Sequence, residues 1–125
     1  MINFNKNSEP LDLSYLKDMS GDSPEFIIEM IDMFKIQTPL YIADLAKAVA
    51  EKNWTGVADH AHKIKPTFAY IGREDAKEHM QMMEHNAREG KDLDQLPQEF
   101  ETLQAFVEVL YVKLEEARAG EAKRL

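Results

Sequence analysis

The apolar residues of this 125-residue chain recur at helical spacing over most of its length. The clearest run is Trp54, Val57, Ala61, Ile64, Phe68 and Ile71. Side chains three or four positions apart share one face of an α-helix, whereas a half-buried strand needs alternation. The stretches between the five glycines and five prolines are rich in Ala, Leu, Met, Glu and Lys, which are strong helix formers. The sequence therefore predicts an all-α fold.

Capping and breaking residues divide the first half of the chain into predicted helices. Leu11, Leu13 and Leu16 indicate a short first helix that ends at Gly21. Ser23-Pro24-Glu25 then supplies an N-cap, a proline at the first helical position and an acid in the first turn. Thr38-Pro39 repeats this cap-then-proline signal. It predicts either a new helix or a kink in the same one.

The second half divides in the same way. Asn53 is a candidate cap for the next helix, and Gly72 is the expected break at its end. A further helix ends before Gly90, and residues 90–97 read as the longest loop. The last helix is expected from about Gln98 to about Arg118.

Long amphipathic helices joined by short turns pack most economically as a bundle. We expect an up-and-down four-helix bundle over residues 11–118, with an additional short N-terminal helix or helices. Residues 1–10 read as a loose N-terminal tail, and residues 119–125 read as a frayed C-terminal tail.

Composition excludes several classes of function. There are no cysteines, so disulfides, thiolate catalysis and Cys-ligated zinc are excluded, and the four histidines lack metal-ligand spacing. The net charge of −8 argues against nucleic-acid binding, which needs a basic surface. The sequence has no apolar run long enough to span a membrane and no secretory signal. A soluble cytoplasmic domain without a metal site is the expectation.

His62 is the candidate chemical group. It follows Ala61 at the edge of the apolar stripe, so we expect an exposed imidazole on a backbone anchored by Ala61 and Ile64. A neutral imidazole is a competent nitrogen nucleophile near neutral pH. Lys65 lies one turn away, where its charge would offset a phosphoryl group on the ring.

The segment from His62 to Gly72 resembles the phosphoacceptor helix of histidine-containing phosphotransfer (HPt) domains of two-component phosphorelays. That family has a histidine, a lysine three residues later, a small or hydroxyl residue about five later and a glycine ten later. The matching residues here are Ala61, His62, Lys65, Thr67 and Gly72. Many members have glycine four residues after the histidine, whereas this chain has Pro66, for which we expect a local kink rather than a break.

The resemblance implies a phosphoryl carrier without catalytic turnover of its own. His62 would accept phosphate from a receiver-domain aspartate, or from a kinase, and pass it to another response regulator. The partners would be receiver domains of response regulators or hybrid histidine kinases. Magnesium is expected only on the receiver, and no cofactor on this chain. Counting from Gly72, Glu84 falls where a polar residue often orients the acceptor imidazole in this family.

Two groups of residues are candidates for partner binding. The first surrounds His62 and comprises Ala58, Asp59, Pro66 and Ala69. The second comprises Ile27, Ile31 and Phe34, from a helix with more apolar side chains than one inward stripe needs. Two accounts of that helix stay open: a helix packed on two sides, and an exposed apolar patch that receives a response regulator.

A second function stays open on sequence alone, namely a helical-bundle adaptor that binds response regulators without phosphotransfer. An independent enzyme lacks support, because the sequence has no phosphate-binding glycine loop, carboxylate cluster or catalytic triad. A monomer is the simpler expectation for a bundle with one transfer histidine.

Overall fold

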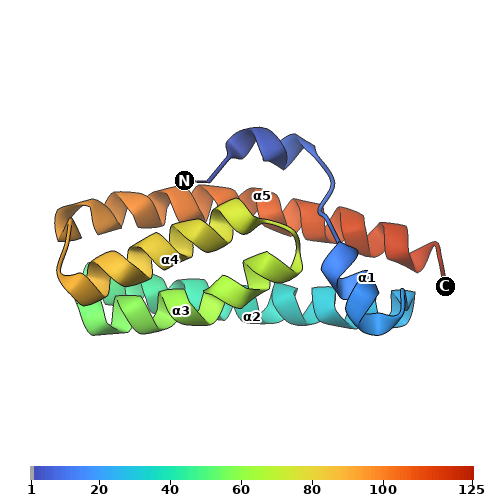
Figure 1. Ribbon diagram of the computed structural model, residues 1–125, viewed down its shortest axis with the longest axis horizontal. Helices are drawn as coiled ribbons and strands as arrows, with labels where there is room; N and C mark the ends of the chain where they lie inside the picture. Colours follow the sequence, from blue (N-terminus) through green and yellow to red (C-terminus); the bar gives the residue numbers. More distant parts are fainter. Residues whose placement is uncertain (1) are drawn as a thin grey trace.

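The computed structural model describes residues 2–125, all but Met1, and consists of helices and connecting turns (Figure 1). A 3-10 helix, η1 (Phe4–Ser8), precedes the α-helices, and a second, η2 (Leu93–Gln95), precedes the last of them. The α-helices are α1 (Ser14–Ser20), α2 (Pro24–Ala50), α3 (Trp54–Tyr70), α4 (Glu74–Glu89) and α5 (Leu96–Ala122). No strand occurs in the described part of the chain. The predicted all-α class is confirmed.

Helices α2 to α5 form an up-and-down bundle, as expected. In the bundle α3 packs against α2 and α4, and α5 packs against α2 and α4. Figure 1 shows α1 crossing one end of the bundle beside α2, with the N-terminal segment lying over α5. Because each turn between α2, α3 and α4 is only three residues long, successive helices must run antiparallel.

The core is built from the apolar stripes that the sequence places on each helix. Phe68 of α3 and Phe106 of α5 meet edge to face at 5.4 Å between ring centroids, a favoured aromatic geometry. The other large side chains with almost no exposed surface include Ile27, Ile31, Leu45, Ile64, Met80, Met83 and Leu103. These buried contacts hold α3 against the other three helices of the bundle.

Both internal prolines lie within continuous helices. The sequence left open a new helix at Thr38-Pro39, but α2 runs unbroken from Pro24 to Ala50. Buried side chains on both sides of Pro39, Phe34 and Leu45, hold the two halves of α2 against the same core. Helix α3 likewise continues through Pro66, as predicted.

Gly72 ends α3 and allows the turn into α4. Its φ of +76° lies in the left-handed region, and a Cβ there would lie 2.5 Å from Asp12 Cβ. Only glycine meets both conditions without strain. This turn places α4 against α3.

Residues 2–10 are not a loose tail, which corrects the expectation for this part of the segment, and Met1 lies outside the described residues. Ile2 is buried, and Asn3 caps η1 through its side chain. The backbone carbonyl of Asn3 and the side chain of Asn7 both accept hydrogen bonds from Arg73. This segment is fastened to the start of α4 by residues far away in sequence.

The last helix is longer than expected at both ends. It begins at Leu96, inside the segment expected to be a loop, and reaches Ala122, inside the segment expected to fray. Leu96 is fully buried, which anchors the first turn. At the other end Glu121 is buried and pairs with Arg124, which also pairs with Asp22. These contacts hold the C-terminus against the α1–α2 turn.

Candidate functional site

His62 lies on the outer face of α3 at the middle of the bundle. Its side chain is 62% exposed, while Ala61 and Ile64 beside it are fully buried. The backbone under the imidazole is therefore held by the core and the ring faces solvent. This is the placement that the helical spacing predicts.

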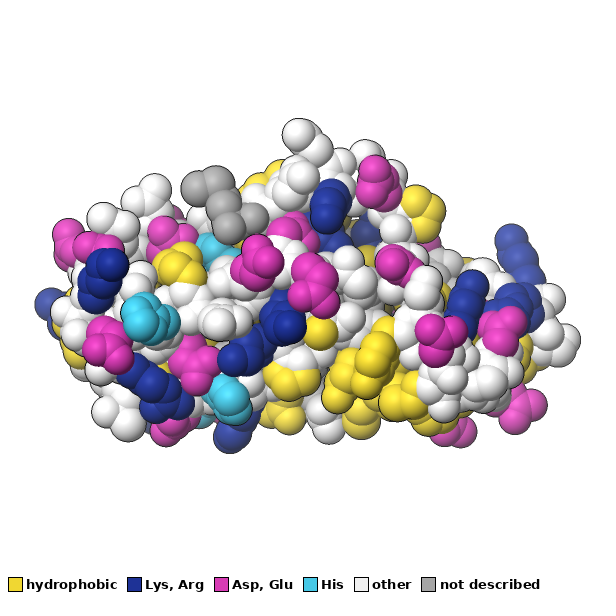
Figure 2. Space-filling view, viewed as in Figure 1, with side chains coloured by type: hydrophobic (Ala, Val, Ile, Leu, Met, Phe, Trp, Pro, Cys, Tyr) yellow, Lys and Arg dark blue, Asp and Glu magenta, His cyan; other side chains and the backbone are white. Residues whose placement is uncertain are grey.

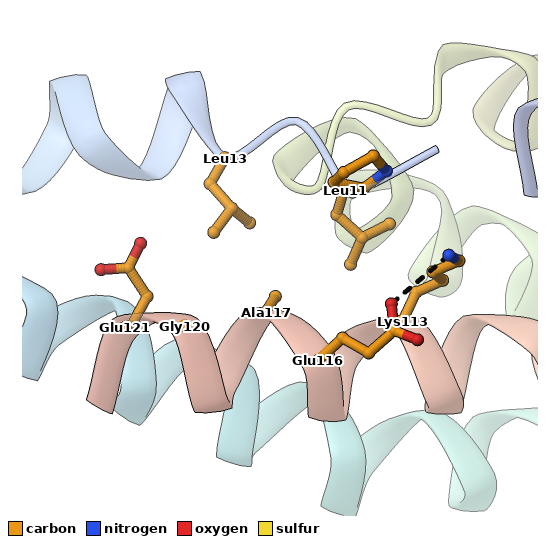
Figure 3. Close-up of a pocket in the computed structure, with 8 residues that line it drawn as sticks. Leu11, Leu13, Lys113, Glu116, Ala117, Gly120 and Glu121 are labelled. Atoms are coloured by element: carbon orange, nitrogen blue, oxygen red, sulfur yellow. Dashed lines mark hydrogen bonds and ion pairs between the residues drawn. The ribbon is translucent and has the colours of Figure 1, made fainter. Parts of the chain in front are cut away.

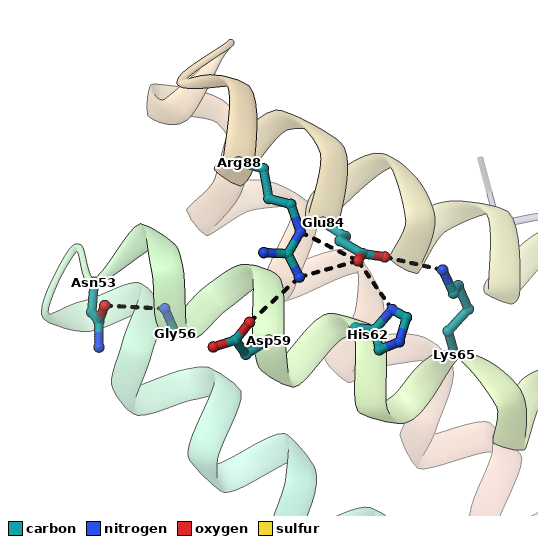
Figure 4. Close-up of polar contacts among 7 residues, drawn as sticks. All are labelled: Asn53, Gly56, Asp59, His62, Lys65, Glu84 and Arg88. Atoms are coloured by element: carbon teal, nitrogen blue, oxygen red, sulfur yellow. Dashed lines mark hydrogen bonds and ion pairs between the residues drawn. The ribbon is translucent and has the colours of Figure 1, made fainter.

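Glu84 of α4 holds the imidazole through one of its nitrogens. His62 Nδ1 lies 3.0 Å from Glu84 Oε2, and Lys65 Nζ lies 3.0 Å from the other carboxylate oxygen, Oε1 (Figure 4). The side chain of Glu84 is only 14% exposed. The residue reached by counting from Gly72 is thus in contact with both His62 and Lys65.

The pKa of the Glu84 carboxyl is lowered from its ordinary value. Burial acts to raise it, but the hydrogen bond and charge of Lys65, with smaller contributions from His62 and Arg88, outweigh that effect. Glu84 is therefore ionised at neutral pH and can only accept hydrogen bonds. It follows that Nδ1 of a neutral His62 carries the proton, which leaves a lone pair on Nε2.

The second ring nitrogen is directed away from Glu84 (Figure 4). No described residue forms a hydrogen bond with it. An exposed nitrogen with a free lone pair, on a ring fixed through the other nitrogen, can attack an electrophile that arrives from solvent. Lys65, one turn along α3, supplies a cation close to the same position.

Arg88 is a functional candidate that the sequence reasoning missed. Its guanidinium lies 3.4 Å from Glu84 Oε2 and 3.4 Å from Asp59 Oδ1, so it bridges α4 to α3. Its position four residues after Glu84 is the only sequence signal, because residues at that spacing share a helix face. We refer to Asp59, His62, Lys65, Glu84 and Arg88 as the Glu84 cluster.

The candidate partner-binding residues around His62 divide by exposure. Asp59 and Pro66 are exposed, and Ala69 is partly buried. Ala58 is fully buried, which corrects its assignment to the surface: it faces the core from the turn below His62. In this conformation a partner can therefore contact Asp59, Pro66 and Ala69 but not Ala58.

The expected apolar patch of Ile27, Ile31 and Phe34 is not a surface. Ile27 and Ile31 are fully buried and Phe34 is 2% exposed, so this expectation is corrected. Helix α2 packs against α3 and α5 at once, and these side chains fill the space between them. The exposed large apolar side chains of α2 are instead Met33, Ile36 and Leu40.

An apolar surface nevertheless lies beside the charged cluster. Tyr15 of α1 stacks on Tyr70 at the end of α3, with centroids 5.2 Å apart, and Tyr15 is 53% exposed. Figure 2 shows hydrophobic side chains gathered over this part of the molecule, next to a histidine and charged side chains over α3 and α4. Pro66 and Ala69 lie on α3 between His62 and Tyr70.

The other histidines belong to different surroundings. Burial lowers the pKa of His79, whose Nε2 lies 2.9 Å from the Glu99 carbonyl oxygen, so this ring is a neutral donor inside the bundle. His60 lines a hollow between α2 and α3, away from Glu84. Within residues 2–125 no group of three His, Asp or Glu side chains is placed to hold a metal ion.

Of two hollows on the surface, one adjoins the Glu84 cluster and the other does not. One of about 210 Å³ lies directly beside the cluster, lined by Lys65, Gln81, Glu84, His85, Arg88 and Glu89. Another, of about 340 Å³, lies between the N-terminal segment and α5, with Leu11, Leu13 and Ala117 in its wall (Figure 3). The second contains no member of the Glu84 cluster, so we assign it no role in the chemistry.

None of the described helices is long and apolar enough to cross a membrane.

Comparison with known proteins identifies one family. The family model described as Hpt domain matches residues 29–111, which is more than half of the chain. The match begins within α2, contains α3 and α4 whole and ends within α5. Searches among curated proteins and among solved structures gave no match.

Proposed function

The chain belongs to the Hpt domain family, and from this premise we propose that it is a phosphoryl carrier with His62 as its acceptor. The family places the chain in two-component phosphorelays. Our proposal is that His62 takes the phosphoryl group from a receiver-domain aspartate, or from a kinase, and passes it to another response regulator. The observation that carries it is the His62 ring, held at Nδ1 by Glu84 with Nε2 free.

The transfer step follows from that geometry. The Nε2 lone pair attacks the phosphorus of the aspartyl phosphate, and an Nε2–P bond forms as the P–O bond to the aspartate breaks. The aspartate leaves as a carboxylate, and the ring keeps its proton on Nδ1 against Glu84. No general base is required, because the attacking nitrogen carries no proton. In the reverse direction the same atoms return the phosphoryl group to an aspartate.

Position and electrostatics then account for this chain's part in the chemistry. Lys65, whose side chain is 20% exposed, lies beside the ring and offsets phosphoryl charge. Arg88 lies on the other side of the Glu84 carboxylate. Magnesium would be supplied by the receiver domain, and under the proposal this chain needs no cofactor.

Receiver domains are the partners of this family. We propose that one docks over the exposed face of α3, where Asp59, Pro66 and Ala69 accompany His62, and extends towards Tyr70 and Tyr15. This face combines charge next to the acceptor with apolar surface farther along the helix. The surface is continuous with the acceptor nitrogen, which an in-line attack requires. A monomeric carrier in the cytoplasm fits the same proposal.

The adaptor alternative has the same fold and the same docking face but no covalent step. A phosphorylated receiver with Mg²⁺, labelled in its phosphate, distinguishes the two. Transfer predicts label on this chain that is labile to acid and stable to base, and that is lost in His62→Gln. His85→Gln, which changes an exposed histidine beside the site, should keep the label. Receiver binding without label on the wild-type chain would support the adaptor and contradict the carrier.

A further inference from the structure

Both cations of the Glu84 cluster are already paired with carboxylates. Lys65 donates to Glu84 Oε1, and Arg88 divides its hydrogen bonds between Glu84 Oε2 and Asp59 Oδ1. With a neutral imidazole, the two positive charges of the cluster match its two negative charges. The resting site is therefore close to neutral and its main polar groups are paired.

A phosphoryl group changes this balance. It places about two negative charges close to the ring. The ring offsets one of them, because with Nε2 bonded to phosphorus and Nδ1 still protonated it carries a positive charge. The described cluster holds no uncommitted side-chain cation to meet the other. Lys65 and Arg88 can contact the phosphoryl oxygens only by weakening their bonds to Glu84 or Asp59. Glu84, which is shielded from solvent, repels the added charge more strongly than a fully exposed carboxylate would.

We propose that Glu84 makes the phosphorylated form of this protein a ready donor, by competing with the phosphoryl group for Lys65 and Arg88. The inference rests on the proposed function and adds a regulatory property to it. Glu84 is a positioning residue here: it contacts the imidazole and the cations, and acts on the phosphoryl group through them.

The hydrogen bond to Nδ1 acts in the same direction. When the Nε2–P bond breaks, the bond electrons return to Nε2 and the ring leaves as a neutral imidazole if Nδ1 still holds its proton. A carboxylate keeps that proton on the ring, so the imidazole remains a good leaving group. An amide in place of Glu84 would neither retain the proton as firmly nor occupy the two cations.

The test uses the full-length chain and phosphoramidate, a small donor that needs no receiver. Nε2 attacks its phosphorus, the P–N bond breaks and ammonia leaves. After removal of the donor, ³¹P NMR follows the loss of phosphohistidine from the wild type, Glu84→Gln, Asp59→Asn and Glu78→Gln. Glu78 is exposed on α4 outside the cluster, so its variant controls for the loss of one negative charge.

We expect the half-life of phosphohistidine to rise about fivefold in Glu84→Gln, from the removal of one nearby charge, and about twofold in Asp59→Asn. It should be unchanged in Glu78→Gln. Asp59 is exposed, so its variant keeps the test valid if Glu84→Gln folds poorly. Half-lives equal to the wild type, or shorter, in both cluster variants would overturn the inference. The proposed function would then still stand, provided that His62→Gln takes up no phosphate.

A second readout separates positioning from general stability. In the unphosphorylated wild type, ¹⁵N shifts should show the neutral His62 ring protonated at Nδ1, and Glu84→Ala should lose this preference. A wild-type ring protonated at Nε2 would overturn the inference. Absence of any phosphohistidine at His62 of the wild type, with phosphoramidate and with receivers, would overturn the proposed function and this inference together.

Discussion

The α3–α4 pair carries two charged clusters that differ in burial and in how completely their groups are paired. At the turn between the helices, Arg73 and Asp75 form a bidentate ion pair with side chains 7% and 10% exposed. Arg73 also donates hydrogen bonds to the Asn3 carbonyl oxygen and to Asn7 Oδ1. The Arg73 guanidinium lies 4.6 Å from the Phe106 ring centroid. We refer to Asn3, Asn7, Arg73 and Asp75 as the Arg73 cluster.

The Glu84 cluster has the opposite character. Its central carboxylate is shielded, but His62 is 62% exposed and Arg88 is 47% exposed. One imidazole nitrogen has no partner among the described residues. A buried cluster in which each group is paired contributes to the fold and has no group available to a ligand. A ring that is held at one nitrogen and has a free lone pair on the other can react. The difference separates a structural cluster from a chemical one.

The largest expected effect is on stability, and it should differ between the two arginines Arg73 and Arg88. Arg73→Met should lower the free energy of unfolding by about 3–5 kcal/mol, because it leaves Asp75 charged and shielded without its partner. Arg88→Met should change it by less than about 1 kcal/mol, because Arg88 is itself 47% exposed, its contacts are long at 3.4 Å, and Glu84 keeps Lys65 as a partner. Urea denaturation measures both. Equal losses of stability for the two variants would remove the contrast between the clusters.

The contribution of the Arg73 cluster to the free energy of unfolding should depend on pH. Burial acts to raise the pKa of Asp75, but hydrogen bonds from Arg73 and from the Asn3 backbone outweigh it and lower the pKa from 3.8 to about 2. A depressed folded-state pKa gives stability that is present above the unfolded value and lost as the pH falls through the folded value. The stabilisation amounts to about 2 kcal/mol.

Unfolding experiments on Asp75→Asn at several pH values test this linkage. The stability difference from the wild type should be about 2 kcal/mol larger at pH 6 than at pH 2, with most of the change between pH 4 and 2. A difference that is constant over this range would contradict the assigned ion pair.

The smallest of these effects concerns Lys65, and it should be seen mainly in the rate of phosphoryl transfer. Lys65→Met should slow phosphoryl transfer to His62 from a phosphorylated receiver by about tenfold, because one charge-assisted contact to the phosphoryl group is lost. Its free energy of unfolding should fall by about 1–2 kcal/mol, less than for Arg73→Met, because Glu84 is shielded but keeps His62 and Arg88 as partners. Rapid-quench measurements with labelled receiver give the rate, and an unchanged rate would remove Lys65 from the mechanism.

Much of this arrangement could be predicted from local sequence patterns. Helical spacing predicts His62 on an exposed face. The resemblance to HPt domains, counted from Gly72 across a short turn, implies Glu84 as its partner. Local spacing cannot decide which side of α2 is covered, and so it leaves open both an exposed patch and a helix packed on two sides. Ile27 and Ile31 are fully buried between two helices, which is the second of these. A helix that packs on both sides has an apolar pattern resembling that of an exposed patch.

The remaining errors involve contacts between residues far apart in the chain. Arg73 and Asn7 are 66 positions apart, and no periodicity connects them, so the first ten residues read as a tail. Arg88 was missed because its role depends on Asp59, which belongs to another helix. Such contacts depend on tertiary packing, which local patterns do not encode.

The central claim is that phosphate is carried on Nε2 of His62 while Nδ1 stays with Glu84. The most direct measurement is ¹H–¹⁵N and ³¹P NMR of the ¹⁵N-labelled protein after exchange with a phosphorylated receiver and Mg²⁺. The account predicts one phosphohistidine, at His62, with phosphorus on Nε2 and the ring proton on Nδ1. Phosphorus on Nδ1, or on another histidine, would contradict it.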